Sequence, residues 1–441
     1  MERKSANSKT VLDLFCGAGG MGLGFTQAGF KISFAVDNYP AAVETYRANL
    51  GDHIQALDLS NNIDLPKTDI IVGGPPCQGF SSAGVRRVGD VRNSLVSQFA
   101  DIIVRNRPLA FVFENVEGFL TAENGERVFD LLAPLIDAGY NIHLRKINAA
   151  EYGVPQHRKR VIGIGGLGWS PKFPAPTHRP FGAPGVFAKH ENLPPTPTLA
   201  DALAGLGVPS ETAPGHPQGH FTKPLSPADA ARAALLGEGQ KMRDLPPELR
   251  HDSYNRRANR RVQDGTETAR RGGAPTGIRR LRFDEPSKTV TGGARAEFLH
   301  PTEPRNLTIR ECARIQSFPD DFIFKGALAD QIQLIGNAVP PQFARVLAES
   351  LSRQLNQLPA QLPFAMGPGT LLSFQPTDSP GYSPALRSVT DRVQEIWGGL
   401  VKQERTKRWQ QVAVGEIDTA LGSRCWSGVA RGCSSQNSRR H

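Results

Sequence analysis

One cysteine stands where a nucleophile would be expected. Cys77 lies in Gly73-Gly-Pro-Pro-Cys-Gln-Gly-Phe-Ser81, directly after an apolar run. The prolines restrict the backbone and turn the thiol out at the carboxyl end of a strand, where doubly wound enzymes place their active sites. An ordinary thiol, with a pKa of about 8.5, needs a positive or hydrogen-bonding environment to react at neutral pH. The alternative interpretation is a small, buried, apolar cysteine.

A glycine-rich segment near the N-terminus is typical of a ligand-binding turn between a strand and a helix. Residues 13–25 read Asp-Leu-Phe-Cys-Gly-Ala-Gly-Gly-Met-Gly-Leu-Gly-Phe. Glycines let the backbone approach a ligand closely, and a helix N-terminus offers free N–H groups. Asp37 follows Gly17 by 20 residues, where a doubly wound fold places a carboxylate for a ribose. Asp58 could bind an adenine amino group or be a loop carboxylate, and a dinucleotide would fit the same turn.

Two further motifs carry polar groups, and the first of them ends at the same predicted sheet edge. Glu114 ends the apolar run in Phe111-Val-Phe-Glu-Asn-Val116, and its carboxyl group could share a proton with a ring nitrogen of a substrate. Arg158 and Arg160 alternate on one face of Gln156-His-Arg-Lys-Arg160 and could bind phosphate or a base oxygen. In isolation, each motif also fits a bland role, a helix cap for the carboxylate and a solvated basic turn for the arginines.

These side chains require an α/β scaffold, and the hydrophobic pattern predicts one. Short apolar runs predict strands at residues 10–15, 31–36, 68–72, 109–114 and 161–164. Continuous apolar runs are typical of buried parallel strands. Amphipathic segments such as 41–50 and 126–138 predict helices between them. The fold class is therefore a doubly wound sheet with a second, irregular domain.

Changes in composition and hydrophobic periodicity along the chain predict four segments. Residues 8–170 form the first part of the chemistry-bearing domain, and residues 171–305, rich in Pro, Gly, His and Arg, form the irregular domain. Residues 306–357 return to regular periodicity, with a long helix at 341–355. Residues 358–441 are expected to be a partly disordered extension; a mobile, solvated tail is favoured there, and a short helix over 392–411 is the alternative.

Bulk composition excludes several classes of protein. The 441 residues, 39% apolar and 21% charged, suit two packed domains plus a tail. No apolar stretch of about 18 residues predicts a membrane span, and the polar N-terminus predicts no export signal, so we expect a cytoplasmic protein. The five cysteines form no CxxC pair, which argues against a disulfide framework or a metal site.

The charge predicts a polyanion partner. The formal net charge is +10, and residues 241–282 alone hold 12 Lys or Arg against 5 Asp or Glu. Because this excess is concentrated in one stretch, it favours nucleic acid more than the net charge does by itself.

Taken in order, the motifs resemble those of the DNA (cytosine-5) methyltransferase family of bacterial restriction–modification systems. Two more of the family's motifs follow, Arg310-Glu-Cys-Ala-Arg-Ile-Gln-Ser-Phe-Pro-Asp320 and Gly336-Asn-Ala-Val-Pro-Pro341. Six motifs in family order make accidental matching negligible. The resemblance covers about residues 8–170 and 285–355.

The resemblance implies a fold, a cofactor and a reaction. The sheet would be the Rossmann-like sheet of S-adenosylmethionine-dependent methyltransferases, and S-adenosylmethionine would donate a methyl group to carbon 5 of a flipped cytosine. Cys77 would attack carbon 6, Glu114 would hold the cytosine edge, and Arg160 with Arg158 would clamp the base and the backbone. The residues expected to line the cofactor pocket are Phe15, Gly17, Gly19, Asp37, Asp58, Pro75, Asn337 and Val339.

The partner implied is double-stranded DNA, read by residues 171–305 as the target-recognition domain. Thr289 and Thr291 resemble a segment that the family keeps near the flipped base. The residues predicted to contact DNA are Ser81, Arg256, Arg257, Arg260, Arg279, Arg280, Thr289, Thr291 and Arg295. We further expect a monomer in the bacterial cytoplasm that protects host DNA from a cognate restriction endonuclease without a stable complex.

Two other functions remain as alternatives. A branch of the family methylates tRNA, but its cysteine loop usually reads Pro-Pro-Cys-Gln-Pro-Phe-Thr, whereas Gly79 and Ser81 stand here. A DNA-binding regulator without catalysis would be expected to have a damaged cysteine or cofactor loop, and both are intact.

Overall fold

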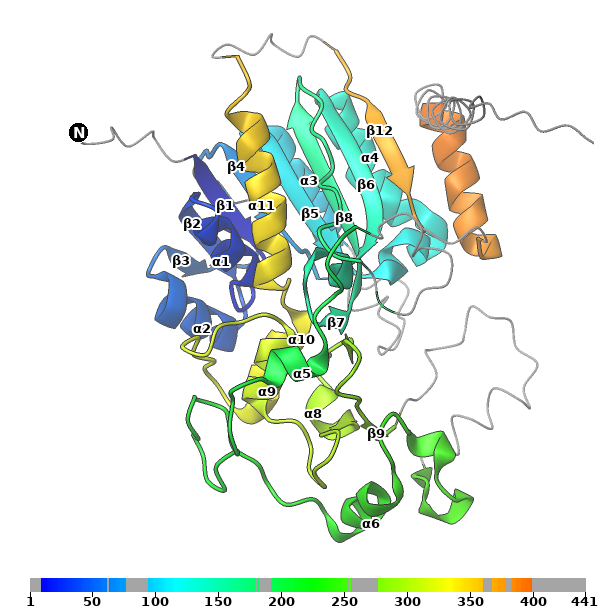
Figure 1. The fold of residues 1–441 in the computed structure, drawn as a ribbon. Helices are drawn as coiled ribbons and strands as arrows, with labels where there is room; N and C mark the ends of the chain where they lie inside the picture. The colour runs from blue at the N-terminus through cyan, green and yellow to red at the C-terminus, as the bar shows by residue number, and fades with distance from the viewer. Residues whose placement is uncertain are drawn as a thin grey trace, which may run out of the picture.

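An eight-stranded sheet forms the centre of the molecule (Figure 1). The computed structural model describes residues 9–61, 63–76, 94–179, 181, 192–252, 254, 277–359, 367–377 and 382–398. The strand order is β12-β6-β8-β5-β4-β1-β2-β3. The strands are β1 (Thr10–Leu14), β2 (Lys31–Asp37), β3 (Ile54–Ala56), β4 (Ile70–Gly73), β5 (Ala110–Asn115), β6 (Tyr140–Asn148), β8 (Lys159–Leu167) and β12 (Leu371–Gln375).

Helices cover both faces of this sheet, which explains the continuous apolar runs. Val11 points to the face covered by α1 (Gly20–Gln27) and α11 (Pro341–Leu355), and its neighbour Leu12 points to the face covered by α3 (Ser94–Asn106) and α4 (Glu126–Asp137). Both side chains are fully buried. Because each strand is buried on both sides, apolar and polar residues cannot alternate along it. The predicted doubly wound α/β class is confirmed.

The predicted strands are correct in place, but not all of them are parallel. β8 runs antiparallel to both of its neighbours, β5 and β6, so the prediction of parallel strands is wrong for residues 161–164. A strand buried on both faces has the same apolar run whichever way it points, so composition cannot give its direction. The hydrophobic pattern does not predict β6, because Asn141, Arg145 and Lys146 interrupt its buried residues.

The chain crosses from one half of the sheet to the other between β1 and β4. β2 and β3 lie on one side of β1, and β4 and β5 lie on its other side. The carboxyl ends of β1 and β4 therefore lie at the switch point of the sheet, which is the usual ligand site of such folds. Helix α2 (Pro40–Leu50) connects β2 to β3 beside this edge.

The second part of the molecule has little regular structure. Its short helices are α5 (Leu199–Leu203), α6 (Pro227–Leu235), η5 (Met242–Asp244), η6 (Pro247–Leu249) and α8 (Ala294–Glu297). Two further short segments, η2 (Glu117–Gly125) and η3 (Ala149–Tyr152), pack into the hydrophobic cores of the sheet. Two small parallel ladders join β10 (Ser287–Lys288) to β7 (Gln156–His157) and β11 (Phe298–Leu299) to β9 (Arg279–Arg280).

The returning helices α9 (Ile309–Ile315) and α10 (Leu328–Asn337) pack against both parts. Their hydrophobic cluster includes Ala18 beside the first strand, and Leu281 and Val290 of the irregular part. Polar bonds add to this packing, since Asn49 of α2 exchanges two hydrogen bonds with the backbone of Ile323. The segment before α10 is therefore fixed to the domain that carries the glycine-rich turn.

The C-terminal extension contains regular structure within residues 367–377 and 382–398. Strand β12 extends the sheet beside β6, and helical residues 384–398 pack on α4. Val393 of this helix is fully buried, and the Trp397 ring stacks on Phe129 with centroids 5.6 Å apart. The helix begins before the predicted residue 392, because the edge of β6 and the face of α4 supply partners that the local sequence does not reveal.

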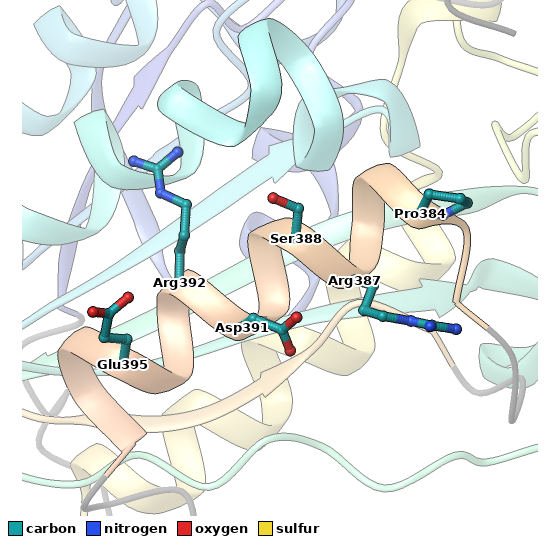
Figure 2. A pocket seen from close by; sticks show the side chains of 6 residues that line it. All are labelled: Pro384, Arg387, Ser388, Asp391, Arg392 and Glu395. Atoms are coloured by element: carbon teal, nitrogen blue, oxygen red, sulfur yellow. The ribbon is translucent and has the colours of Figure 1, made fainter.

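A surface hollow of about 450 Å³ lies along this C-terminal helix. Figure 2 shows its lining, which comes from one helix only. These residues are Pro384, Arg387, Ser388, Asp391, Arg392 and Glu395. None of them belongs to the carboxyl edge of the sheet, so the hollow is separate from the site described next. Among the described residues, no helix is long and apolar enough to cross a membrane, and no cluster of metal-binding side chains occurs.

Candidate functional site

The glycine-rich turn after β1 has the backbone of a ligand-binding loop. Phe15, Gly17 and Gly19 all have positive φ angles of 53°, 55° and 87°. The left-handed conformation of Phe15 is unusual for a residue with a side chain and typical of functional sites. A Cβ atom on Gly17 would have no neighbour within 4 Å, whereas one on Gly19 would lie 2.4 Å from the Leu50 side chain. The loop is thus anchored at Gly19 and open at Gly17.

Asp37, at the carboxyl end of β2, holds this loop in place. Its Oδ2 accepts a hydrogen bond from the Gly17 N–H at 2.8 Å, and its Oδ1 accepts one from the Tyr39 N–H at 2.9 Å. Burial raises the pKa of this carboxyl group, and the backbone donors oppose the shift. The structure therefore brings Asp37 to the glycine loop, as the spacing predicted. Asp58 is exposed and accepts a hydrogen bond from its own loop at Ser60, which lowers its pKa.

A buried ion pair occupies the carboxyl end of β5. The Arg160 Nε atom lies 2.8 Å from Glu114 Oε1, and the two side chains are only 14% and 10% exposed. Burial lowers the pKa of Arg160, and Glu114 counteracts this. Arg160 lies at the start of β8, and only the antiparallel direction of this strand brings it to the carboxyl end of β5 beside Glu114.

The loop that carries Cys77 leaves the sheet beside this pair. Asn115 donates a hydrogen bond from Nδ2 to the Pro75 carbonyl at 3.1 Å. A Cβ atom on Gly74 would lie 3.0 Å from Glu114 Oε2. Pro75, two residues before Cys77, is therefore fixed next to Glu114. Cys77 itself and Ser81 lie outside the described residues.

The return segment completes the same edge. A Cβ atom on Gly20, the first residue of α1, would lie 2.2 Å from the Val339 carbonyl oxygen. Asn337 is exposed at the end of α10, and Val339 is nearly buried. The structure therefore places Val339 beside Gly20, where the glycine loop enters α1, although more than 300 residues of sequence lie between them; Asn337 precedes Val339 by two residues.

The role predicted for Arg158 needs correction. Its side chain is fully buried, and its guanidinium donates to the carbonyls of Val290, Gly336 and Ala338 at 3.1, 2.9 and 2.9 Å. A side chain with no exposed surface and three backbone acceptors cannot also clamp a DNA phosphate. The alternation of Arg158 and Arg160 along the extended segment predicts that they share a face, but it does not predict that only Arg158 is fully buried.

Arg280 also differs from its prediction as a DNA-contacting residue. It is buried and donates to backbone carbonyls, including those of Leu236, Ala233 and His300. It therefore stabilises the irregular part from within. Arg279 and Arg295 are partly exposed. Arg256, Arg257 and Arg260 lie outside the described residues.

The threonines predicted near a flipped base lie beside β7. The Thr289 hydroxyl donates to the His157 carbonyl at 2.6 Å, and the Thr291 hydroxyl accepts from the Gly293 N–H at 3.2 Å. Both side chains are partly exposed. Their segment therefore runs next to residues 156–158, three positions before Arg160.

The sequence search did not single out Asp13, which lies beneath the glycine loop. Its carboxyl group is almost completely buried, and burial, with the neighbouring Asp37, raises its pKa to about 8. Its Oδ2 atom has no hydrogen-bond partner among the described residues. Only its position inside the quoted motif could have indicated it. Cys16 and Cys312 are buried, and burial raises the pKa of each thiol, so neither is a nucleophile.

The fold and this edge define an α/β protein with its candidate ligand site at the carboxyl ends of parallel strands. The family model described as C-5 cytosine-specific DNA methylase matches residues 9–353. The chain therefore belongs to the C-5 cytosine-specific DNA methylases, and its activity is DNA (cytosine-5) methylation. Members of this family use S-adenosylmethionine as methyl donor.

Individual relatives agree with this membership. The Type II methyltransferase M1.HphI of Haemophilus parahaemolyticus is 35% identical over 78% of this chain and 87% of its own length. The Type II methyltransferase M.AgeI of Thalassovita gelatinovora is 33% identical over 77% of this chain and 98% of its own. Among solved structures, an E. coli prophage protein described as a DNA modification methyltransferase shares the fold, with a TM-score of 0.58, 24% identity, and coverage of 79% of this chain and all of that one.

Proposed function

We propose that the residues at the carboxyl edge of the sheet divide into a cofactor wall and a base pocket. The cofactor wall consists of the open turn at Gly17, the carboxylate of Asp37, and Asn337 with Val339. The base pocket consists of Cys77, Glu114 and Arg160. The observation that carries this division is the Glu114–Arg160 pair, which lies beside the loop leading to Cys77. Phe15, Gly19, Pro75 and Asp58 complete the proposed cofactor contacts.

The cofactor wall fits S-adenosylmethionine chemically. Space is open around Gly17, and the N-terminus of α1 lies next to it. Asp37 can accept hydrogen bonds from ribose hydroxyls, because each carboxylate oxygen has more than one acceptor site. When bound, S-adenosylmethionine supplies an electrophilic methyl group.

The base pocket fits the chemistry of cytosine. Carbon 5 of cytosine is a poor nucleophile, and attack of the Cys77 thiolate on carbon 6 makes it electron-rich. Glu114, held by Arg160, can accept a hydrogen bond from the exocyclic amine and, in its protonated form, donate a proton to ring N3, which neutralises the negative charge that thiolate attack places there; N3 returns this proton to Glu114 when the ring is restored. After carbon 5 has gained the methyl group, loss of its proton and expulsion of the Cys77 thiolate restore the ring.

The substrate proposed is a short specific site in duplex DNA. Carbon 6 is out of reach inside a stacked duplex, so the cytosine must be flipped out at a cost of a few kcal/mol. Arg256, Arg257, Arg260, Arg279 and Arg295, with Ser81, Thr289 and Thr291, are the proposed DNA contacts. The positive charge of the arginines would offset this cost through phosphate contacts.

Labelled S-adenosylmethionine, plasmid DNA and bisulfite sequencing test the function directly. We expect label on carbon 5 of cytosine in one recurring short motif. Cys77→Ala should abolish transfer but retain DNA and cofactor binding, because only the covalent step needs sulfur. Turnover by Cys77→Ala would refute the proposed nucleophile, and transfer to tRNA instead of DNA would refute the substrate.

The proposed biological role is protection of host DNA from a restriction endonuclease. The relatives named above are Type II methyltransferases, which supports this role. We expect the enzyme to act as a monomer in the bacterial cytoplasm, without a stable complex with the endonuclease. Plasmid methylated by the protein should resist an endonuclease of the same site, and light scattering should give the mass of one chain.

A further inference from the structure

Arg158 is a buried positive charge that the proposed chemistry does not use. Among the residues that the structure describes, its acceptors are three backbone carbonyls and no carboxylate. Burial lowers its pKa, and nearby Arg160 adds to this effect. Burying an arginine in this way is costly, so the carbonyls must be held firmly around it.

Two of these carbonyls belong to the C-terminal end of α10. The Arg158 Nη2 atom donates to Gly336 and Ala338, while Gln316 donates to the carbonyl of Ile335. The last carbonyls of a helix lack partners within the helix and carry its negative dipole end, so a cation is stabilising there. Arg158 and Gln316 together cap α10. The capped end carries Asn337, the last residue of α10, which is proposed to belong to the cofactor wall.

The third carbonyl belongs to the segment 289–292. Val290 accepts from Arg158, and its own N–H donates to Gln156 Oε1 at 3.0 Å. A Cβ atom on Gly336 would lie 2.4 Å from the Thr291 carbonyl carbon and 2.5 Å from the Gly292 nitrogen. The backbone of this segment therefore rests directly against the end of α10.

These contacts form one continuous path between two sites. Segment 289–292 contacts Gly336, Arg158 bonds both of them, and Val339 contacts Gly20 of the glycine loop. The guanidinium fork is rigid and bonds its acceptors in fixed directions. If DNA moves segment 289–292, either the end of α10 moves with it or a buried charge loses an acceptor.

From this path we infer that Arg158 is a positioning residue that couples DNA binding to cofactor binding. The inference rests on the proposed assignment of Asn337 and Val339 to the cofactor wall. DNA contacting segment 289–292 changes the affinity for the cofactor through Arg158, and the cofactor changes the affinity for DNA by the same factor.

Binding of labelled S-adenosylhomocysteine measures this coupling without turnover. Its Kd is determined by equilibrium dialysis on the full chain, free and saturated with unmethylated plasmid DNA, and the ratio of the two values is the coupling factor. We expect a factor of about 5–150 for the native protein, the usual range for coupled sites. Arg158→Lys keeps the charge but loses the fork, and should bring the factor to within about twofold of one.

Arg280→Lys is the matched control. Arg280 is also buried and bonded to carbonyls, but its acceptors lie in the irregular part and not at α10. This variant should keep the native factor. If Arg158→Lys does not fold, Gln156→Met decides. It conserves volume but removes the bonds of Gln156 to Val290, Ile315 and Gln316, so it loosens both segment 289–292 and the Gln316 cap of α10, and it too should lower the factor.

Three results would overturn the coupling: a native factor of one, a native-like factor in the decisive variant, or equal losses in that variant and Arg280→Lys. Failure of the proposed function is distinguishable from these. Native protein that binds both ligands but transfers no methyl group would contradict the proposed function and leave the binding ratio measurable.

Discussion

Replacing Glu114 with glutamine separates the charge of this side chain from its shape. The carboxylate and Arg160 are both mostly buried, with Nε and Oε1 2.8 Å apart. Removing one partner of a buried pair costs about 3–5 kcal/mol. Glutamine keeps an amide oxygen for Arg160, so only the charge-assisted part is lost, and the loss of unfolding free energy should be about 1–3 kcal/mol.

Glu114→Gln should affect turnover more strongly than it affects stability. Charge develops on the cytosine ring after thiolate attack, and Glu114 is the group proposed to stabilise it. Removing one such preorganised group typically lowers kcat by about 100- to 1000-fold, or about 2.7–4 kcal/mol of transition-state stabilisation. Glu114→Gln should therefore bind DNA and cofactor but turn over in this reduced range.

The assay is the initial rate of label transfer from S-adenosylmethionine to plasmid DNA at saturation, with urea unfolding as the measure of stability. Glu117→Gln is the control, because Glu117 pairs with Lys146 nearby but is 47% exposed. It should change stability by less than about 1 kcal/mol and leave turnover unchanged. Glu114→Gln turnover within about threefold of native would refute the role given to the carboxylate.

Three further predictions concern stability. Burial, with Arg145 adding to it, lowers the pKa of His143 to about 4. The unfolded chain therefore binds more protons than the folded one between pH 4 and about 6.5, and the free energy of unfolding falls as pH falls through that window. His143→Gln should remove up to about 3 kcal/mol of this pH dependence in urea titrations, and an unchanged dependence of the unfolding free energy on pH would contradict it. Burial raises the pKa of Asp13 to about 8, so stability is lost as pH rises from about 4 to 8; Asp13→Asn should gain stability relative to native protein over that range, and a constant difference would exclude a buried proton there. Val393→Ala should lower the free energy of unfolding by about 1.5–2.5 kcal/mol, whereas Ile396→Ala should change it by less than about 0.5 kcal/mol, because Ile396 is 57% exposed on the same helix. Equal losses in the two variants would show that the helix does not pack on α4.

Much of the site could be predicted because its residues follow strands whose pattern is strong. β1, β2 and β5 are short apolar runs, and Gly17, Asp37 and Glu114 each follow or end one of them. In a parallel sheet, strand ends meet at one edge whatever the details of packing. Position in the chain was therefore enough to bring these residues together.

Arg158 and Arg280 show where this reasoning fails. An arginine in a basic or exposed-looking segment can bond a phosphate or a set of backbone carbonyls, and its donors suit both. The carbonyls around Arg158 come from residues 290, 336 and 338, more than 130 positions away. Local sequence cannot report such acceptors. The same holds for β12, whose partner β6 lies over 200 residues earlier.

The late position of β12 has a consequence for biosynthesis. β6 ends at Asn148, and the strand that covers its edge begins at Leu371. At synthesis rates of about 5–20 residues per second, that edge stays uncovered for roughly 10–45 s on the ribosome. An open strand edge is a template for pairing with other chains. Synthesis of the C-terminal strand therefore ends a period in which the chain can aggregate through the edge of β6. Chains that terminate before residue 371 would leave the ribosome with this edge uncovered.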